Sequence, residues 1–219
     1  MTAKRRFKCD SSYKQEVELG DGQEVTLRLV QPTDKKLLLS GLARMSPQSR
    51  YFRFMGARNG FKESALRYLC EVDGINHFAM GAVVKNKDGS EQGVAVARFI
   101  RLPNASEVAD PAITVVDDYQ GKGLGRLLLK RLTRAARERG VRRFRCDFLP
   151  SNQKIRSLLG DFEQSAIIQE DNDVVTMDFE LPEPSVGELM SEALHNSGMY
   201  QAFVEVARGV LPVRVNGPS

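Results

Sequence analysis

The sequence contains few of the residues that build metal centres and disulfide frameworks. Its three cysteines, Cys9, Cys70 and Cys146, are odd in number and far apart, so they match neither a disulfide framework nor a metal-ligand spacing. Two histidines, His77 and His195, are too few for a histidine-rich metal site. We therefore expect no bound metal, and a reducing compartment, most simply the cytoplasm.

Long apolar runs are also missing. No stretch in the 219 residues approaches the roughly 20 apolar residues that cross a bilayer. The basic residues 1–7 are not followed by an apolar segment, so we expect neither a secretory signal nor a membrane partner. Internal repeats and low-complexity tracts are absent as well. A hydrophobic content of 42% nevertheless supports a real core.

The most informative stretch that is present joins a strand to a helix through a glycine-rich turn. Residues 113–116 are a β-branched run, Gly121, Gly123 and Gly125 follow, and apolar residues then recur at helical spacing up to Gly140. Such a turn directs unpaired backbone N–H groups and the positive end of the helix dipole at one spot. The spacing therefore predicts a binding site for a phosphate or pyrophosphate.

Two common nucleotide loops do not fit this turn. A Walker A loop needs Gly-Lys-Ser/Thr after four spacer residues, which is absent. A dinucleotide fingerprint needs G-x-G-x-x-G, whereas the glycines here are spaced G-x-G-x-G, although Asp147 lies near the distance of its acidic residue. The preceding Gln120 separates the possibilities, because Q-x-x-G-x-G resembles the acyl-CoA pyrophosphate loop of GNAT N-acetyltransferases. The wider string of residues 109–129 is similar to the bacterial protein-lysine acetyltransferase group.

The order of predicted elements agrees with that resemblance over residues 24–182. The resemblance implies a mixed α/β (α+β) fold, with a central, mostly antiparallel sheet split at the acyl-CoA cleft. We expect residues 1–23 to be an irregular lead-in and residues 183–219 to be a helical extension. The predicted strands are 25–29, 78–84, 93–100, 110–116, 144–149, 167–168 and 174–181, and the predicted helices are 37–42, 47–54, 62–71, 124–139 and 152–159.

The extra C-terminal helix is expected over residues 185–208, between prolines on either side. Three interpretations stay open for it. It packs on its own domain, it forms a homodimer, or it covers the substrate groove.

The resemblance implies acetyl-CoA as co-substrate and an amine acceptor, most simply a protein lysine. The general base is expected at Asp110, on the strand before the loop, with Glu107 as second choice. Asn152 stands where the family binds pantetheine, but Leu159 stands where it often has a tyrosine that protonates sulfur. The expected cofactor-binding residues are Val115, Val116, Gln120, Gly121, Lys122, Gly123, Leu124, Gly125, Arg126 and Asn152.

Two other functions remain as alternatives. The aspartate in place of the family's glutamate, together with Leu159, is compatible with an acyl-CoA-binding module that has lost efficient chemistry. Residues 122–145 carry ten Lys or Arg and one acid, which resembles a nucleic-acid-binding face. Because the formal net charge is only +4 and no aromatic residues interleave, we do not expect a nucleic-acid partner.

Overall fold

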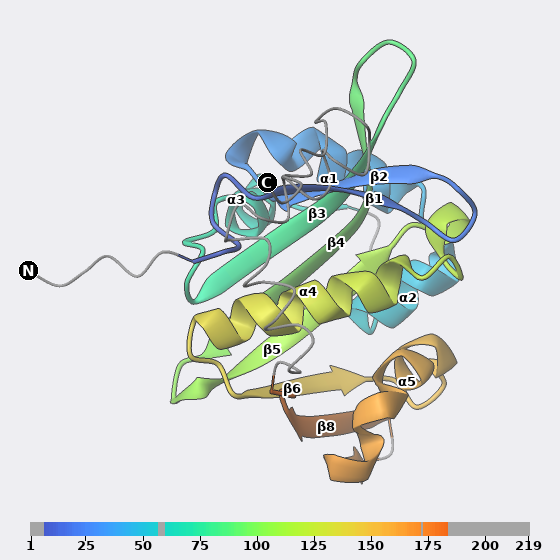
Figure 1. The fold of residues 1–219 in the computed structure, drawn as a ribbon. Coiled ribbons are helices and arrows are strands. Elements are labelled where there is room, and N and C mark those ends of the chain that lie inside the picture. The colour runs from blue at the N-terminus through green and yellow to red at the C-terminus, as the bar shows by residue number, and fades with distance from the viewer. Residues whose placement is uncertain (1–6, 57–59, 172, 184–219) are drawn as a thin grey trace, which may run out of the picture. The chain divides into compact units, whose positions relative to one another are not determined.

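The structure is a computed structural model that describes residues 7–56, 60–171 and 173–183. It contains an eight-stranded sheet in the order β1-β2-β3-β4-β5-β6-β8-β7 (Figure 1). The order of elements predicted from the sequence is confirmed over residues 24–182. The strands are β1 Lys14–Glu18, β2 Glu24–Leu29, β3 His77–Lys85, β4 Glu91–Leu102, β5 Ala105–Val115, β6 Arg143–Phe148, β7 Ile167–Asp171 and β8 Val174–Glu180.

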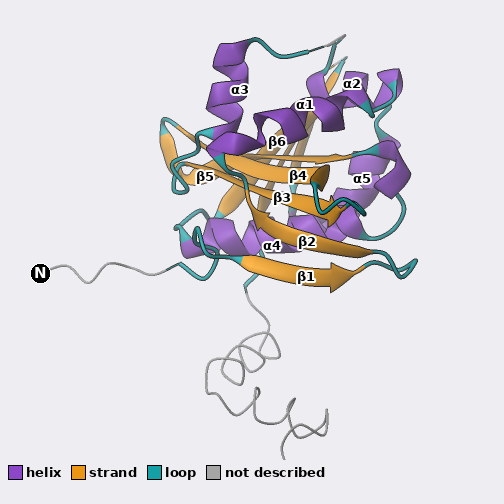
Figure 2. Ribbon diagram, turned by 90° about the horizontal axis from the view of Figure 1, so that it is seen from above, coloured by secondary structure: helices purple, strands orange, loops and turns teal. Residues whose placement is uncertain are grey.

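Helices cover both faces of the sheet. Figure 2 shows α1, α2 and α3 on one side and α4 on the other. The helix α2 begins at Pro47, after Ser46, whose hydroxyl accepts the N–H of Ser49 as an N-cap. The α-helices are α1 Lys35–Ala43, α2 Pro47–Phe54, α3 Glu63–Cys70, α4 Leu124–Glu138 and α5 Gln153–Leu159.

The main core lies between α4 and the sheet. Leu124, Leu128 and Leu132 recur at the four-residue spacing of one helix face, and each is fully buried. Burying a leucine side chain contributes about 1.5–3 kcal/mol, so this stripe holds α4 firmly on the strands. On the sheet side, Phe78, Phe99, Phe144 and Phe179 form a chain of ring contacts with centroids 5.5–6.3 Å apart.

The sheet splits between β5 and β6. These two strands are parallel and pair only at Val108 with Arg143 and at Ala109 with Phe144, whereas every other pairing in the sheet is antiparallel. Beyond Ala109, β5 therefore pairs only with β4. The edge of β5 that faces β6 is left with unpaired backbone groups that a ligand can contact. The predicted mostly antiparallel, split sheet is confirmed.

The prediction of an irregular segment over residues 1–23 was wrong for residues 14–18. That segment is β1, an edge strand whose Val17 pairs with Val25 of β2. Val17 is the only apolar residue of β1 and packs against the core, while its neighbours alternate with it toward solvent. An edge strand that buries one side chain has too little apolar alternation to stand out in a sequence.

Two compact units divide the chain, Met1–Leu181 and Pro182–Ser219. The predicted helix over residues 185–208, and the homodimer or groove cover that it suggested, fall outside the described residues. In the part of the chain that the structure describes, we find no helix with the length and apolar character to cross a membrane.

Candidate functional site

The glycine turn has the geometry that the sequence predicted. Gly121 and Gly123 have φ angles of +74° and +84°, in the left-handed region that glycine adopts without strain. Gly123 is the N-cap of α4, and a Cβ at either position would meet nothing within 4 Å. The first N–H groups of α4, from Leu124 to Arg126, have no carbonyl of their own helix to bind. The turn therefore offers an open set of N–H donors suited to a phosphate.

Gln120 fastens this turn to its surroundings. Its amide Nε2 donates to the carbonyl oxygen of Val115 at 2.9 Å, and its Oε1 accepts from Lys154 Nζ. One side chain thus joins the end of β5 to α5. The backbone N–H of Gln120 also donates to the Asp117 carbonyl oxygen at 3.1 Å. The predicted ligand residue therefore holds the loop in place, and the phosphate donors are left to the residues that follow it.

The basic residues of the turn differ in their surroundings. Lys122 Nζ lies 2.8 Å from Asp21 Oδ2, a hydrogen bond that raises the lysine pKa, and 5.1 Å from the centre of the Tyr119 ring. Arg126 is exposed on the first turn of α4. A phosphate in this turn must therefore compete with Asp21 for Lys122, whereas Arg126 is accessible to it.

Val115 and Val116 close the strand beside the turn. Val115 ends β5 opposite Ala95, and Val116 donates its N–H to the Val94 carbonyl at 2.9 Å with its side chain buried. Both lie on the stretch of β5 past Ala109 that no longer pairs with β6. Because the Val115 carbonyl already accepts from Gln120 and the Val116 N–H donates to β4, the remaining backbone groups of this edge are the ones placed to bind an extended chain between β5 and β6.

Asp110 lies at the point where the sheet splits. It directly follows Ala109, the last residue of β5 paired with β6. Although the residue keeps contact with solvent, desolvation by surrounding protein raises its carboxyl pKa to about 6; Arg53 opposes this rise and Asp147 of β6 adds to it. Such a carboxylate is mostly ionised at neutral pH and basic enough to accept a proton, as a general base must.

The structure does not bring Glu107 together with Asp110. Glu107 lies where the pairing of β5 with β4 is irregular, between Ala105 and Ala109, whereas Asp110 pairs regularly with Ile100. Glu107 Oε1 instead lies 3.2 Å from Arg142 Nε, with both side chains more than 60% exposed. The geometry therefore favours Asp110 as the base.

Asn152 and Leu159 begin and end α5. The Asn152 Oδ1 accepts the N–H of Ile155 at 3.2 Å, which makes Asn152 the N-cap of that helix, and its amide nitrogen has no partner among the described residues. Leu159 is 2% exposed and packs in the core. A buried hydrocarbon side chain thus occupies the position where the family often has a tyrosine that protonates sulfur.

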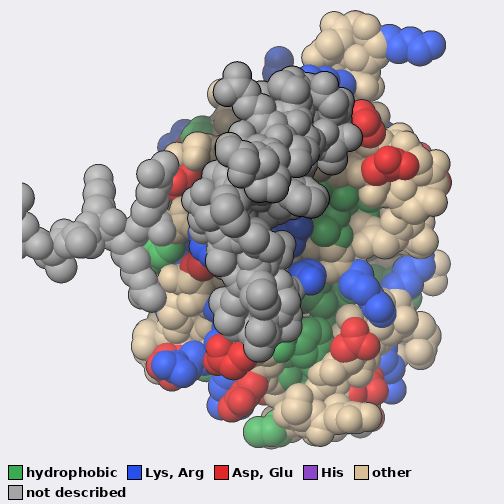
Figure 3. Space-filling model, viewed as in Figure 1, with side chains coloured by type: hydrophobic (Ala, Val, Ile, Leu, Met, Phe, Trp, Pro, Cys, Tyr) green, Lys and Arg blue, Asp and Glu red, His purple; other side chains and the backbone are tan. Residues whose placement is uncertain are grey.

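The basic residues of 122–145 do not form a free cationic stripe. Arg143 and Arg145 both lie 2.8 Å from Asp178, and the guanidinium of Arg139 is buried against backbone carbonyls of Cys9, Gly74 and Ala135. On the part of the surface not covered in grey, Figure 3 shows basic and acidic side chains interspersed. This pairing weakens the nucleic-acid alternative, which needs cations free to meet phosphates.

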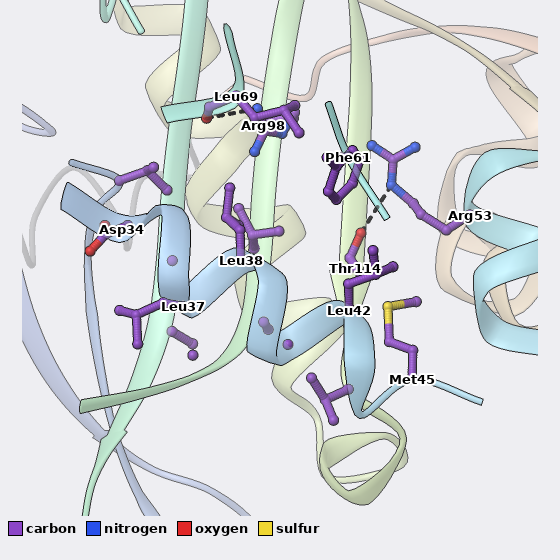
Figure 4. Close-up of a pocket in the computed structure, with 18 of the residues that line it drawn as sticks. Asp34, Leu37, Leu38, Leu42, Met45, Arg53, Phe61, Leu69, Arg98 and Thr114 are labelled. Carbon is purple, nitrogen blue, oxygen red and sulfur yellow. Dashed lines mark hydrogen bonds between the residues drawn. The ribbon is translucent and has the colours of Figure 1, made fainter. Parts of the chain in front are cut away.

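Two arginines lie near the site; the sequence pattern of residues 46–54 suggested Arg53 as a residue of the acceptor groove, whereas Arg98 was not predicted. Arg53 of α2 donates through Nε to Thr114 Oγ1 at 2.9 Å, on the face of β5 that also carries Asp110 (Figure 4). Arg98 of β4 is 4% exposed on the same face of the sheet, opposite Ala112. A sequence signal for Arg98 does exist, because it stands alone as a charge within the apolar run of residues 94–100.

A split mixed sheet with a phosphate turn at its opening and a carboxylate beside it defines a class of proteins that transfer acyl groups from CoA thioesters. The family model of the acetyltransferase (GNAT) family matches residues 52–160. Acetyltransferase PA5475 of Pseudomonas aeruginosa is 30% identical over 140 residues, which are 64% of this chain and 74% of that protein. The chain belongs to the GNAT family of acetyltransferases.

Two further relatives are named Pat or PAT. Acetyltransferase Pat of Mycolicibacterium smegmatis is 33% identical over 166 residues, which are 76% of this chain and 48% of Pat. The crystal structure of the GNAT domain of S. lividans PAT superposes with a TM-score of 0.68 at 25% identity, covering 77% of this chain and 97% of that domain. The chain spans about half the length of the mycobacterial relative.

Proposed function

We propose that this chain transfers the acetyl group of acetyl-CoA to the side-chain amine of a protein lysine, by direct attack in a ternary complex. One observation carries the proposal: Asp110, with a carboxyl pKa near 6, stands where β5 and β6 separate. The choice of a protein lysine as acceptor rests only on the similarity of this chain to the Pat proteins. We place the reaction in the cytoplasm, in keeping with the three unbridged cysteines.

In this proposal the pyrophosphate binds the backbone N–H groups of residues 121–126, and the pantetheine arm lies along the free edge of β5 beside Val115 and Val116. A lysine ammonium has an ordinary pKa near 10.4, so it must lose a proton before it attacks. Asp110 takes that proton, directly or through one water. The nitrogen then forms a bond to the thioester carbon while the carbon–sulfur bond breaks.

The thiolate of coenzyme A leaves without a tyrosine donor, since Leu159 occupies that position. The thiolate sulfur is then protonated by water or by the second proton that the amine nitrogen releases as the amide forms. Backbone N–H groups of β5 beyond Ala109 are the proposed donors to the oxyanion that forms at the former carbonyl.

The test combines binding and turnover. Titration calorimetry with acetyl-CoA measures the co-substrate site, and mass spectrometry of lysine-bearing proteins incubated with acetyl-CoA measures transfer. Asp110→Asn should retain binding and lose transfer by about 10²–10⁴-fold, the range for removal of a general base. Asp118→Asn, an exposed carboxylate in the adjoining loop, is the matched control. Binding with no transfer in the wild type would support the non-enzymatic acyl-CoA-binding module instead.

A further inference from the structure

A cavity of about 290 Å³ lies between α1–α3 and the sheet face that carries Asp110. Its wall is largely apolar, and it extends to Thr114 and Val116, on the strand beside the proposed thioester site (Figure 4). The volume is close to the lower end of small-molecule sites, roughly 300–1,000 Å³. An acetyl group would leave most of this space empty. The apolar side chains of the lining include Leu37, Leu38, Leu42, Met45, Phe54, Phe61, Leu69 and Val96.

One wall of this cavity is the guanidinium of Arg98. Its Nη1 donates to the carbonyl oxygen of Leu69 at 3.2 Å and lies 3.1 Å from His77 Nε2. Burial lowers the pKa of His77 to about 4, so its ring is neutral and accepts this hydrogen bond. The Nε and Nη2 of Arg98 have no hydrogen-bond partner among the described residues, and the side chain lines the cavity.

Two other arginines of the described residues, the partly buried Arg28 and the buried Arg139, have acceptors for their guanidinium groups. Arg28 forms a bidentate pair with Asp34 and a second pair with Glu91. Arg139 donates to three backbone carbonyls and lies against the rings of Phe7 and Phe78. Arg98, at 4% exposure, has no carboxylate partner in the described residues. Burying a cation without an anion is energetically costly. The buried Arg98 guanidinium therefore points to an anion that comes from outside the chain.

The charge of the residues that line the cavity favours an acyl group over an amine as its occupant. Arg53 and Arg98 both line it; Arg28 and Asp34 line it too, but they form a bidentate pair whose charges offset each other. Desolvation, together with the nearby Arg53, lowers the pKa of Arg98 to about 10. At neutral pH both remain cations. An acceptor amine approaches as an ammonium, which two guanidinium groups repel. An acyl chain has no positive charge, and a carboxylate at its end would be attracted.

We propose that the cavity binds the distal part of an acyl group that ends in a carboxylate, with that carboxylate on Nε and Nη2 of Arg98. The inference rests on the proposed function, because the chain must first bind a CoA thioester. The acyl donors are then CoA thioesters of dicarboxylic acids with about four to six carbons, a length that fits the cavity volume. The reaction is the same transfer: the amine nitrogen bonds to the thioester carbon, the carbon–sulfur bond breaks, and CoA leaves as the thiolate.

The experiment compares adipoyl-CoA with hexanoyl-CoA, which have the same chain length and differ in the terminal carboxylate. Dissociation constants for both, and for acetyl-CoA, are measured by calorimetry on the full chain. We expect adipoyl-CoA to bind at least about tenfold more tightly than hexanoyl-CoA, the ratio that 1.4 kcal/mol gives. Arg98→Met should abolish or reverse this preference, and Arg98→Lys should retain part of it.

A second variant tests the cavity independently, in case Arg98→Met does not fold. Leu38→Trp fills the cavity from α1 and leaves Arg98 in place, so it should weaken adipoyl-CoA and hexanoyl-CoA alike relative to acetyl-CoA. Arg142→Met, an exposed arginine outside the cavity, is the control and should preserve the preference.

The outcomes separate the two proposals. If acetyl-CoA binds but adipoyl-CoA binds no better than hexanoyl-CoA, the carboxylate site is overturned and the proposed function stands. If the preference exists but survives Arg98→Met, the assignment to Arg98 is overturned. If no CoA thioester binds, the proposed function itself fails.

Discussion

Ser46 and Asp117, 71 residues apart in the sequence, are joined by two hydrogen bonds. The backbone N–H of Ser46 donates to Asp117 Oδ2 and its hydroxyl donates to Asp117 Oδ1, both at 2.9 Å. The hydroxyl of Ser49 adds a third bond at 2.8 Å, so Asp117 ties the start of α2 to the end of β5. These bonds lower the Asp117 pKa, against the opposing effect of desolvation, and fix α2 beside the glycine turn.

Loss of this tie should destabilise the fold. Asp117→Ala removes three acceptor contacts, and we expect the free energy of unfolding in urea to fall by about 1–3 kcal/mol. Asp118→Ala, next to it and exposed, should change it by less than about 0.5 kcal/mol. Equal effects of the two substitutions would show that the contacts to α2 contribute nothing to stability.

The pH dependence of transfer should follow Asp110. Because its folded pKa is about 6, the base is protonated below that value, and kcat/KM, which follows the free enzyme, should rise between pH 5 and 7 with a midpoint near 6. The contribution of Asp110 to the folding stability has the opposite pH dependence to the reaction rate. A carboxyl whose pKa is raised on folding binds its proton more tightly in the folded state, so its contribution is complete below about pH 3.9 and is lost as pH rises through 6. A pH–rate profile that Asp110→Asn leaves unchanged in shape would contradict this assignment.

Two glycines with left-handed backbone angles flank α4, so a substitution at one end can serve as the control for the same substitution in the glycine turn at the other end. Gly123 and Gly140 have φ angles of +84° and +82°, so Gly→Ala at either position should cost about 1–2 kcal/mol of stability. Only Gly123→Ala adds a methyl group in the proposed pyrophosphate site. We therefore expect acetyl-CoA affinity to fall about tenfold in Gly123→Ala, a loss equivalent to 1.4 kcal/mol, and to be preserved in Gly140→Ala. Calorimetric titration at a temperature where both variants are folded makes the comparison.

Asp21 should limit the use of Lys122 by a ligand. Asp21→Ala frees the lysine, and we expect acetyl-CoA to bind about two- to fivefold more tightly at low salt, with the gain shrinking as salt screens it. Lys122→Ala should weaken binding and remove the effect of Asp21→Ala in the double variant. Additive effects in this double-mutant cycle would mean that Asp21 does not act on the ligand through Lys122.

The two roles of Asn152, as N-cap of α5 and as proposed ligand of pantetheine, can be tested separately. Asn152→Ala removes the N-cap of α5 and should cost about 1 kcal/mol of stability as well as acetyl-CoA affinity. Asn152→Ser keeps an oxygen for the Ile155 N–H but removes the amide donor proposed for pantetheine. We expect Asn152→Ser to retain stability and to lose affinity, measured by urea unfolding and calorimetry. Full affinity in Asn152→Ser would remove Asn152 from the binding site.

Local patterns were sufficient to predict most of the secondary structure. The stripe of Leu124, Leu128 and Leu132 defines α4, and Ser46-Pro47 marks the start of α2, because helix periodicity and capping act over a few residues. The turn at Gly121 and Gly123 was predicted for the same reason, since only glycine takes its backbone angles freely. By contrast, β1 depends on a partner strand for its hydrogen bonds, and its own residues barely indicate it.

The sequence by itself determined the kind of loop, the order of elements and the residue types available at the site. The tertiary structure alone decided which of them meet. It paired Glu107 with Arg142 and Lys122 with Asp21, and it buried Arg98 beside an apolar cavity without an acidic partner among the described residues. The reason is physical: backbone preferences are local, but desolvation and charge pairing depend on side chains that the fold brings from distant parts of the chain.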